Sequence, residues 1–94
     1  MEEVQSVLDQ ILKSLVANPD DVEMFFSTET DEQGDLHMIN VKVHRDDVGL
    51  CIGVGGKHAE AIRTIIGLVG YKYTGTRVYV RIDAPKVPKP HFEY

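Results

Sequence analysis

The residues whose types and spacing most clearly could do chemistry form a glycine-rich segment near the middle of the chain. The segment is Gly53-Val54-Gly55-Gly56, and Lys57 follows it directly. Glycines let a turn tighten without side-chain clash, so a phosphate group can come close to the backbone. Free N–H groups at the start of a following helix would point at that phosphate, and the lysine would add positive charge. The segment therefore predicts a phosphate-binding turn.

Two of the three glycine-rich motifs that bind phosphate are excluded by residue type. A P-loop requires G-x-x-x-x-G-K-S/T, but Cys51 occupies the first glycine position and His58 replaces the magnesium-binding hydroxyl residue. A dinucleotide fingerprint requires G-x-G-x-x-G after a strand, and His58 again occupies the last glycine position. The third motif is a G-x-x-G clamp between two helices, which holds the backbone of about four nucleotides. Residues 53–56 fit it, with Ile52 before the turn.

The clamp requires a helix on each side, and the hydrophobic periodicity supplies both within a regular order of elements. We expect a helix over 3–17, strands over 22–29 and 36–44, a short helix over 48–52, a helix from Lys57 to about Val69, and a strand over 77–83. The order is α-β-β-α-α-β. It predicts an α+β fold with helices packed on one face of a three-stranded sheet.

Local signals indicate where these elements begin and end. Asn18-Pro19 ends the first helix because proline cannot continue it. Asp46 and Asp47 can cap the short helix, which explains this carboxylate pair better than acid–base catalysis does. Gly70 can end the long helix. The loop after it then holds the aromatic and basic residues of 71–73, which favour a loop anchored by half-buried tyrosines over base stacking.

The length of 94 residues predicts one domain, which we place at residues 1–84. Pro85, Pro88 and Pro90 make residues 85–94 an extended tail. No apolar run approaches the ~20 residues that span a bilayer, and the N-terminus is acidic rather than a signal peptide. Cys51 is the only cysteine, so no internal disulfide is expected. These features predict a cytoplasmic protein without a membrane partner.

The charge is unevenly distributed along the chain. The formal net charge is −5, but residues 1–47 contain 3 Lys/Arg against 12 Asp/Glu, whereas residues 48–94 contain 7 Lys/Arg against 3 Asp/Glu. Salt screens charges separated by more than about 8–10 Å, so a basic surface on an acidic protein can still bind phosphate. Ordinary solvated surface charge explains the asymmetry equally well.

The remaining reactive residue types do not form a recognisable catalytic or metal site. Cys51 has no evident base beside it and is expected in the core. The four histidines, His37, His44, His58 and His91, lack the close pairing of a zinc site. We therefore expect no catalytic residue, no metal and no cofactor, and no enzyme activity.

With the turn and its flanking elements in place, the chain resembles the small bacterial KH-domain RNA-binding proteins of the KhpA type over residues 3–83. The resemblance is carried by Ala17-Asn18-Pro19-Asp20, Asp46-Asp47-Val48-Gly49, Ile52-Gly53 and Ala61-Ile62-Arg63-Thr64. It implies a type II KH fold with a mixed sheet and binding to single-stranded RNA. It also implies a homodimer and pairing with a larger KH-containing protein of the Jag type.

The expected RNA-binding residues surround the turn. They are Ile52, Gly53, Val54, Gly55, Gly56, Lys57, His58 and Arg63. His58 is either a phosphate contact or an exposed bystander, and Arg63 either reaches RNA or pairs with Glu60.

Two hypotheses for function remain. The first is an RNA-binding protein that grips single-stranded RNA, as a post-transcriptional regulator or RNA chaperone. The second is a KH-fold interaction and dimerisation module with weak or no RNA binding, because Val54 and Gly55 are uncharged where family members carry a basic or polar residue.

Overall fold

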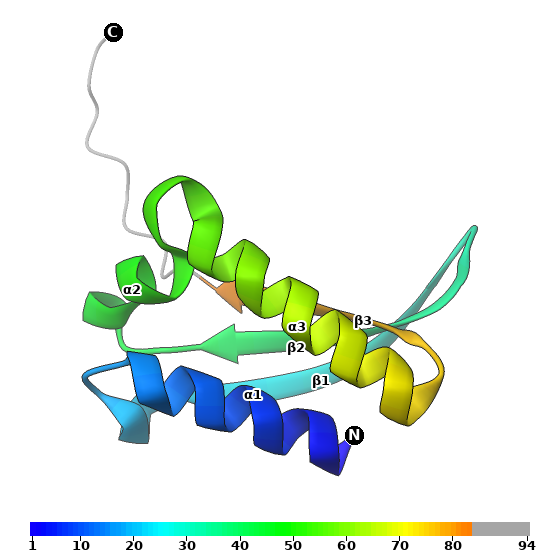
Figure 1. The fold of residues 1–94 in the computed structure, drawn as a ribbon, viewed down its shortest axis with the longest axis horizontal. Coiled ribbons are helices and arrows are strands. Elements are labelled where there is room, and N and C mark those ends of the chain that lie inside the picture. The colour runs from blue at the N-terminus through cyan, green and yellow to red at the C-terminus, as the bar shows by residue number, and fades with distance from the viewer. Residues whose placement is uncertain (84–94) are drawn as a thin grey trace, which may run out of the picture.

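The computed structural model describes residues 1–83, so the expected tail at 85–94 lies outside the described residues. The elements are α1 (Glu2–Leu15), η1 (Pro19–Asp21), β1 (Glu23–Asp31), β2 (Gly34–Lys42), η2 (Arg45–Asp47), α2 (Val48–Ile52), η3 (Val54–Gly56), α3 (Lys57–Thr74) and β3 (Arg77–Asp83), where η marks a short 3₁₀ turn (Figure 1). The sheet order is β1-β2-β3. β1 and β2 are antiparallel, and β2 and β3 are parallel. The α+β prediction with a mixed sheet is confirmed.

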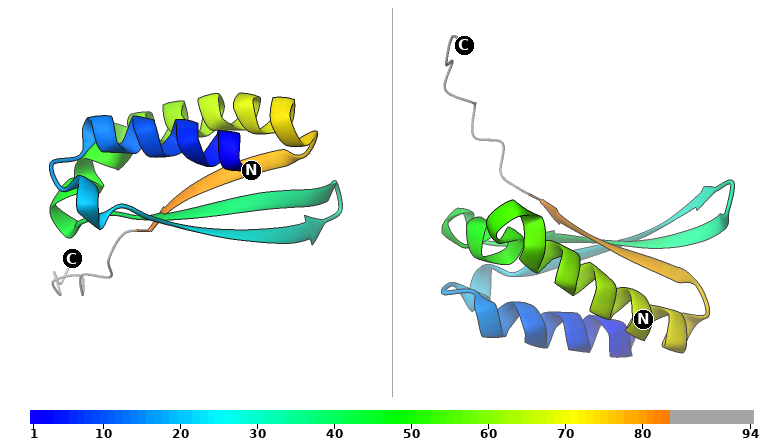
Figure 2. Two further views of the ribbon diagram at one scale, coloured as in Figure 1. Left: turned by 90° about the horizontal axis from the view of Figure 1, so that it is seen from below. Right: turned by 45° about the horizontal axis from the view of Figure 1, so that its top comes forward.

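The molecule has two layers, with the helices together on one face of the sheet (Figure 2). Alternate residues of the strands face the helices because strand side chains alternate between the two faces. The core consists mainly of Leu8 and Leu12 from α1, Ile39 and Val41 from β2, Ile62 and Ile66 from α3, and Val78 and Val80 from β3. The apolar side chains that recur at helical spacing in α1 and α3 therefore pack against those that alternate in β2 and β3, and together they form one core.

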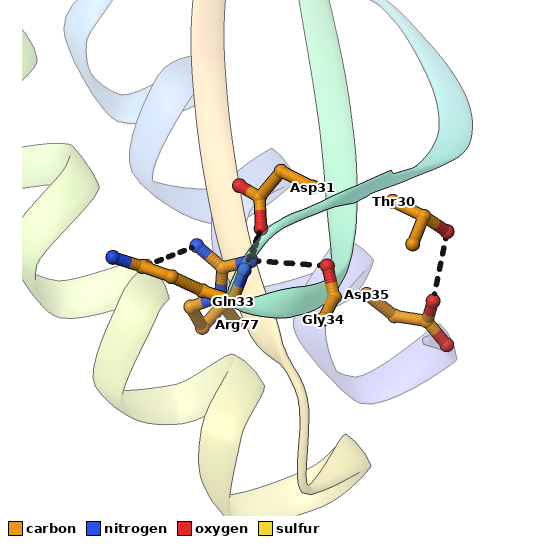
Figure 3. Close-up of polar contacts among 6 residues, drawn as sticks. All are labelled: Thr30, Asp31, Gln33, Gly34, Asp35 and Arg77. Atoms are coloured by element: carbon orange, nitrogen blue, oxygen red, sulfur yellow. Dashed lines mark hydrogen bonds and ion pairs between the residues drawn. The ribbon is translucent and has the colours of Figure 1, made fainter.

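The β1–β2 hairpin is longer than the sequence predicted and extends past the helices (Figure 2). The strands pair as far as Asp31 and Gly34, so only two residues form the turn, whereas the expected strands over 22–29 and 36–44 left residues 30–35 between them. Arg77, the first residue of β3, explains the extension: its Nη2 donates to Asp31 Oδ1 at 2.7 Å and to the Gly34 carbonyl at 3.2 Å (Figure 3). This contact holds the pKa of Asp31 below its ordinary value, helped by the Gln33 N–H.

The end of α3 also differs from the prediction. Gly70 does not end the helix, which continues to Thr74 and ends at Gly75, where φ is +70°. Gly70 is buried where α3 crosses β3, and a Cβ at this position would lie 2.4 Å from Cγ2 of Val78. Its missing side chain therefore serves close packing rather than helix termination. As a result, Tyr71 and Tyr73 are exposed helical residues, and their expected role as loop anchors is wrong.

Asp47 does not cap α2, as the sequence had suggested. Its side chain makes no capping hydrogen bond and is 1% exposed. Its carboxylate instead accepts hydrogen bonds from the backbone N–H of Ala17 at 3.1 Å, and from the backbone N–H of Asn18 at 3.0 Å and its Nδ2 at 3.1 Å. The interaction joins the end of α1 to the start of α2. Burial opposes the charge, but the hydrogen bonds from Ala17 and Asn18 hold the pKa of Asp47 below its ordinary value.

This carboxylate makes the stability of the protein dependent on pH. Because the folded pKa of Asp47 is lowered, its contribution is complete above the ordinary value of 3.8 and is lost as pH falls through the folded pKa. We expect Asp47→Asn to lower Tm at about pH 7 and to flatten the fall in Tm toward about pH 3. Circular dichroism melts at both pH values measure this.

The neighbouring carboxylate supplies the control. Asp46 is exposed, so Asp46→Asn should melt nearly as the wild type does at both pH values. An Asp47→Asn protein with the same Tm and the same acid sensitivity as wild type would contradict the role assigned to Asp47.

Candidate nucleic-acid interface

The glycine-rich segment is the connection between α2 and α3, at the upper left of Figure 1. α2 ends at Ile52, Gly53 follows it, and residues 54–56 make a single 3₁₀ turn before α3 begins at Lys57. The predicted helix–turn–helix is therefore present. A β-strand leading into the turn would have favoured a nucleotide-binding loop, but the element before the turn is the helix α2.

Three glycines of the turn have a positive φ angle, which other residues adopt only with strain. The φ angles are +76° at Gly53, +64° at Gly55 and +78° at Gly56. A Cβ added at Gly55 or Gly56 would have no atom within 4 Å, so both face open space. Glycine adopts these backbone angles without strain, and the open space leaves room for a ligand.

Two neighbouring N–H groups at the start of the turn are in a position to bind a ligand. The N–H of Gly53 donates to the Gly49 carbonyl at 2.8 Å, and that of Gly56 donates to the Gly53 carbonyl at 3.1 Å. Val54 and Gly55 are the first two residues of the 3₁₀ turn, and N–H groups at these positions have no acceptor within the turn itself. Successive free N–H groups in a turn make an anion-binding concavity. The turn therefore has the geometry to receive one phosphate group.

His58 lies against the turn. Its Nδ1 is 2.7 Å from the Leu50 carbonyl. A carbonyl oxygen only accepts, so Nδ1 carries the proton and donates. A Cβ at Gly53 would lie 2.6 Å from Cγ of His58, so Gly53 also has to be glycine for the imidazole to pack there. The structure thus gives His58 a bracing contact that the sequence did not reveal.

The other expected side chains occupy different positions around the turn. Val54 is 89% exposed, and Lys57 is also exposed. Ile52 is half-buried. Beside the turn, an open hollow runs along α3 and is lined by Lys57, Glu60, Ala61, Thr64 and Ile65. It continues the exposed surface of α3, where Leu68 is 71% exposed.

Arg63 points to β3 and does not pair with Glu60, so the intrahelical pairing considered from the sequence is wrong. Its Nε donates to the Val80 carbonyl at 2.9 Å. Its guanidinium carbon lies 5.0 Å from the centroid of the Tyr79 ring, within the range of a cation–π interaction. Tyr79 was not among the expected site residues, although its place between Val78 and Val80 in an alternating strand could have indicated its exposure.

The reactive groups away from the turn lie outside any recognisable site. Cys51 is fully buried, and burial, followed by the nearby charge of Asp47, raises the pKa of its thiol. Across residues 1–83, no cluster of three or more His, Cys, Asp or Glu side chains could hold a metal ion. In the same part of the chain, no helix combines the length and apolarity needed to cross a membrane.

Comparison with known proteins agrees with this arrangement. The family model described as the KhpA/KhpB KH domain matches residues 5–82. The "RNA-binding protein KhpA" of Streptomyces coelicolor is 36% identical over 75 residues, which cover 80% of this chain and 87% of that protein. The "RNA-binding protein KhpA" of Clostridium acetobutylicum is 39% identical over 79 residues, which cover 84% of this chain and 99% of that protein.

Among solved structures, the fold is similar to part of Era from Aquifex aeolicus, crystallised with GDP·AlF₄⁻. The TM-score is 0.68 at 13% sequence identity, and the match covers 92% of this chain but 31% of Era. At this identity the similarity concerns the fold alone.

Proposed function

The chain belongs to the KhpA/KhpB family of KH-domain proteins, and from that premise we propose that it binds single-stranded RNA through the turn at residues 53–56. The observation that carries the proposal is an exposed turn that leads into α3, with the N–H groups of Val54 and Gly55 at its start, where the turn itself offers them no acceptor. The relatives named above as RNA-binding proteins support the same ligand.

In this proposal the turn binds the RNA backbone and not the bases. A phosphate oxygen accepts from the N–H groups of Val54 and Gly55, and the N-terminus of α3 favours its negative charge. Lys57 adds a cation beside it. Ile52 and the exposed methyl groups of Val54 offer apolar contact to the neighbouring nucleotides. His58 holds the turn in shape through Leu50. Arg63 lies further along α3, on the side of β3.

Single strands are expected to bind better than duplexes. The turn has to approach the backbone closely, and bases that are splayed out can reach side chains beside it, whereas paired bases cannot. A fluorescence titration with a labelled single strand and with the same strand annealed to its complement tests the proposal. Equal affinity for both forms would count against it.

Lys57→Ala is expected to weaken RNA binding mildly and to change its salt dependence. The substitution removes roughly one phosphate contact, so the slope of log K against log salt should become shallower by about one unit. Lys72→Ala is the control, because Lys72 lies near the far end of α3, with its Nζ 5.6 Å from the centroid of the Tyr73 ring. Titrations at several salt concentrations measure both. Equal slopes of log K against log salt for Lys57→Ala and wild type would show that Lys57 does not contact an RNA phosphate.

We also propose that the protein forms a homodimer through the exposed side of α3. Ile65 is 46% exposed and Leu68 is 71% exposed, and together they place an apolar surface on the side of α3 away from the core. Burial of such side chains against a second copy would stabilise a dimer. The same surface is proposed to receive the larger KH-containing partner of the Jag type.

Light scattering at micromolar concentration tests the dimer. The expected mass is twice the 10.5 kDa of one chain, and Ile65→Asp should return it to the monomer value. A monomer mass for wild type throughout that range would contradict the proposal.

The uncharged tip of the turn supports a second candidate function. Val54 is 89% exposed, and an exposed apolar residue also suits a protein contact. In that case the domain is an interaction module, and wild type would bind RNA no better than an unrelated acidic protein. The RNA titration therefore decides between the two candidates.

If RNA is the ligand, a role for the protein in the cell can be proposed as well. We propose a cytoplasmic, non-enzymatic protein that acts as a post-transcriptional regulator or RNA chaperone. Residues 1–84 make up the RNA-binding domain, and residues 85–94 are an extension whose Lys86 and Lys89 add positive charge.

A further inference from the structure

The sheet has a second face, which no helix of the described chain covers (Figure 2). The strand residues that alternate with the buried ones lie on it. In register across the three strands, Ser27 neighbours Met38 and Met38 neighbours Tyr79, and in the next row Phe25 neighbours Asn40 and Asn40 neighbours Arg81. Tyr79 is 38% exposed and Phe25 is 55% exposed. Two aromatic rings and a methionine therefore lie on the open face.

The charges of this face are separated by strand. β3 places Arg77 and Arg81 on either side of Tyr79, whereas β1 carries Glu23, Glu29 and Asp31. Arg77 is paired with Asp31, and the one carboxylate of β3, Asp83, lies at its end. Away from this ion pair, the backbones of β1 and β3 are two strand spacings apart, about 10 Å, which is about one Debye length at 0.1 M salt. The β3 half is therefore the half suited to an anionic ligand.

Arg63 connects this half of the open face to the turn. It comes from α3 on the helix side, donates to the Val80 carbonyl, and brings its guanidinium to the Tyr79 ring at 5.0 Å. Val80 and Tyr79 face opposite sides of β3, so the Arg63 side chain passes around the free edge of the strand. Arg63 also follows Gly56 by seven residues of α3, a rise of about 10 Å. An RNA strand that leaves the turn along this side of α3 would contact Arg63 next.

We propose that single-stranded RNA continues from the turn around the edge of β3, and that one further base stacks on Tyr79. Arg63 and Arg81 then contact the phosphates on either side of that base. This inference rests on the proposed function and extends it by a second subsite on a separate face of the molecule. An aromatic ring between arginines suits such a subsite, because every base has a face that can stack and every nucleotide carries a phosphate.

Length dependence tests the subsite. Fluorescein-labelled oligouridines of about four and about ten nucleotides are titrated, since about four nucleotides fill the turn. Tyr79→Ala should weaken binding of the longer strand about tenfold, within the usual range for loss of one stacked base, and leave the shorter strand within about twofold. Tyr79→Phe keeps the ring and should bind both strands as wild type does. Circular dichroism confirms that each variant is folded.

Tyr73→Ala is the matched control. Tyr73 is also an exposed tyrosine with a cation at its ring, Lys72 at 5.6 Å, but it lies at the far end of α3. It should bind both strands as wild type does. If Tyr79→Ala left the longer strand unchanged, or weakened both strands equally, or did no more than Tyr73→Ala, the subsite would be refuted.

Two further outcomes separate this inference from the turn itself. If the paired change Gly55→Asp and Gly56→Asp left binding intact while Tyr79→Ala still weakened the longer strand, the turn would be refuted and the stacking surface supported. If Tyr79→Ala altered the mass of the free protein without altering RNA affinity, the open face would be a protein contact, and the inference would be wrong.

Discussion

Replacing Gly55 and Gly56 together with aspartate should lower the affinity for single-stranded RNA by at least about tenfold, because like charges placed face to face cost several kcal/mol. Both positions face open space, so the new carboxylates would stand where the phosphate is expected. The fold should survive the change. No atom lies within 4 Å of either new Cβ, and aspartate is among the residues that best tolerate a positive φ.

The matching double change to asparagine separates charge from shape. Asparagine has nearly the size of aspartate and tolerates the same backbone angles, but it carries no charge. We expect Gly55→Asn with Gly56→Asn to keep clearly more RNA binding than the aspartate pair at the same salt concentration. Filter binding with both double variants measures this, and circular dichroism confirms their folding. A folded aspartate variant that binds as well as wild type would rule out the clamp.

Gly70→Ala should destabilise the protein by about 1–3 kcal/mol, the usual cost of overpacking a core. The added methyl would lie 2.4 Å from Cγ2 and 2.7 Å from Cβ of Val78, so α3 and β3 would have to move apart. Urea denaturation measures the change as a lower midpoint with a similar slope.

Gly67→Ala, one turn earlier in the same helix, should act in the opposite direction. A Cβ there meets only the Val78 carbonyl, at an ordinary 3.8 Å. The gain in helix propensity from glycine to alanine is up to about 1 kcal/mol. Two alanine variants with equal stability would show that the contact between Gly70 and Val78 does not control packing here.

The features that the sequence predicted well depend on neighbouring residues. Hydrophobic periodicity predicted three helices and three strands with boundaries correct to within two residues, except at the end of α3, and the glycines at 53–56 identified the turn. These signals are local, because a run of apolar positions or a set of glycines has the same meaning in most folds.

The features that the sequence missed depend on distant contacts. Gly70 and Gly75 look alike as stop signals for a helix, and only the packing of Val78 against Gly70 distinguishes them. Asp47 looks like a cap until Ala17 and Asn18, about thirty residues earlier, are seen to donate to it. The hairpin is extended by Arg77, more than forty residues after its turn.

Among the expected site residues, the sequence also predicted what depends on residue type and missed what depends on distant contacts. Gly53, Gly55 and Gly56 have the positive φ angles that a tight turn requires, as their residue type suggested. The sequence predicts His58 and Arg63 as RNA contacts because both follow the turn closely and can donate hydrogen bonds to phosphate. Their contacts are with the Leu50 carbonyl and with β3, and neither contact leaves a local trace in the sequence.

The central claim is that the backbone of the turn receives the RNA, and amide chemical shifts measure this most directly. In a nitrogen–proton spectrum of wild type titrated with single-stranded oligouridine, the largest shifts should fall on the N–H groups of Val54 and Gly55. Smaller shifts should extend into the first turn of α3. Shifts concentrated elsewhere, with Val54 and Gly55 unmoved at saturation, would contradict the account.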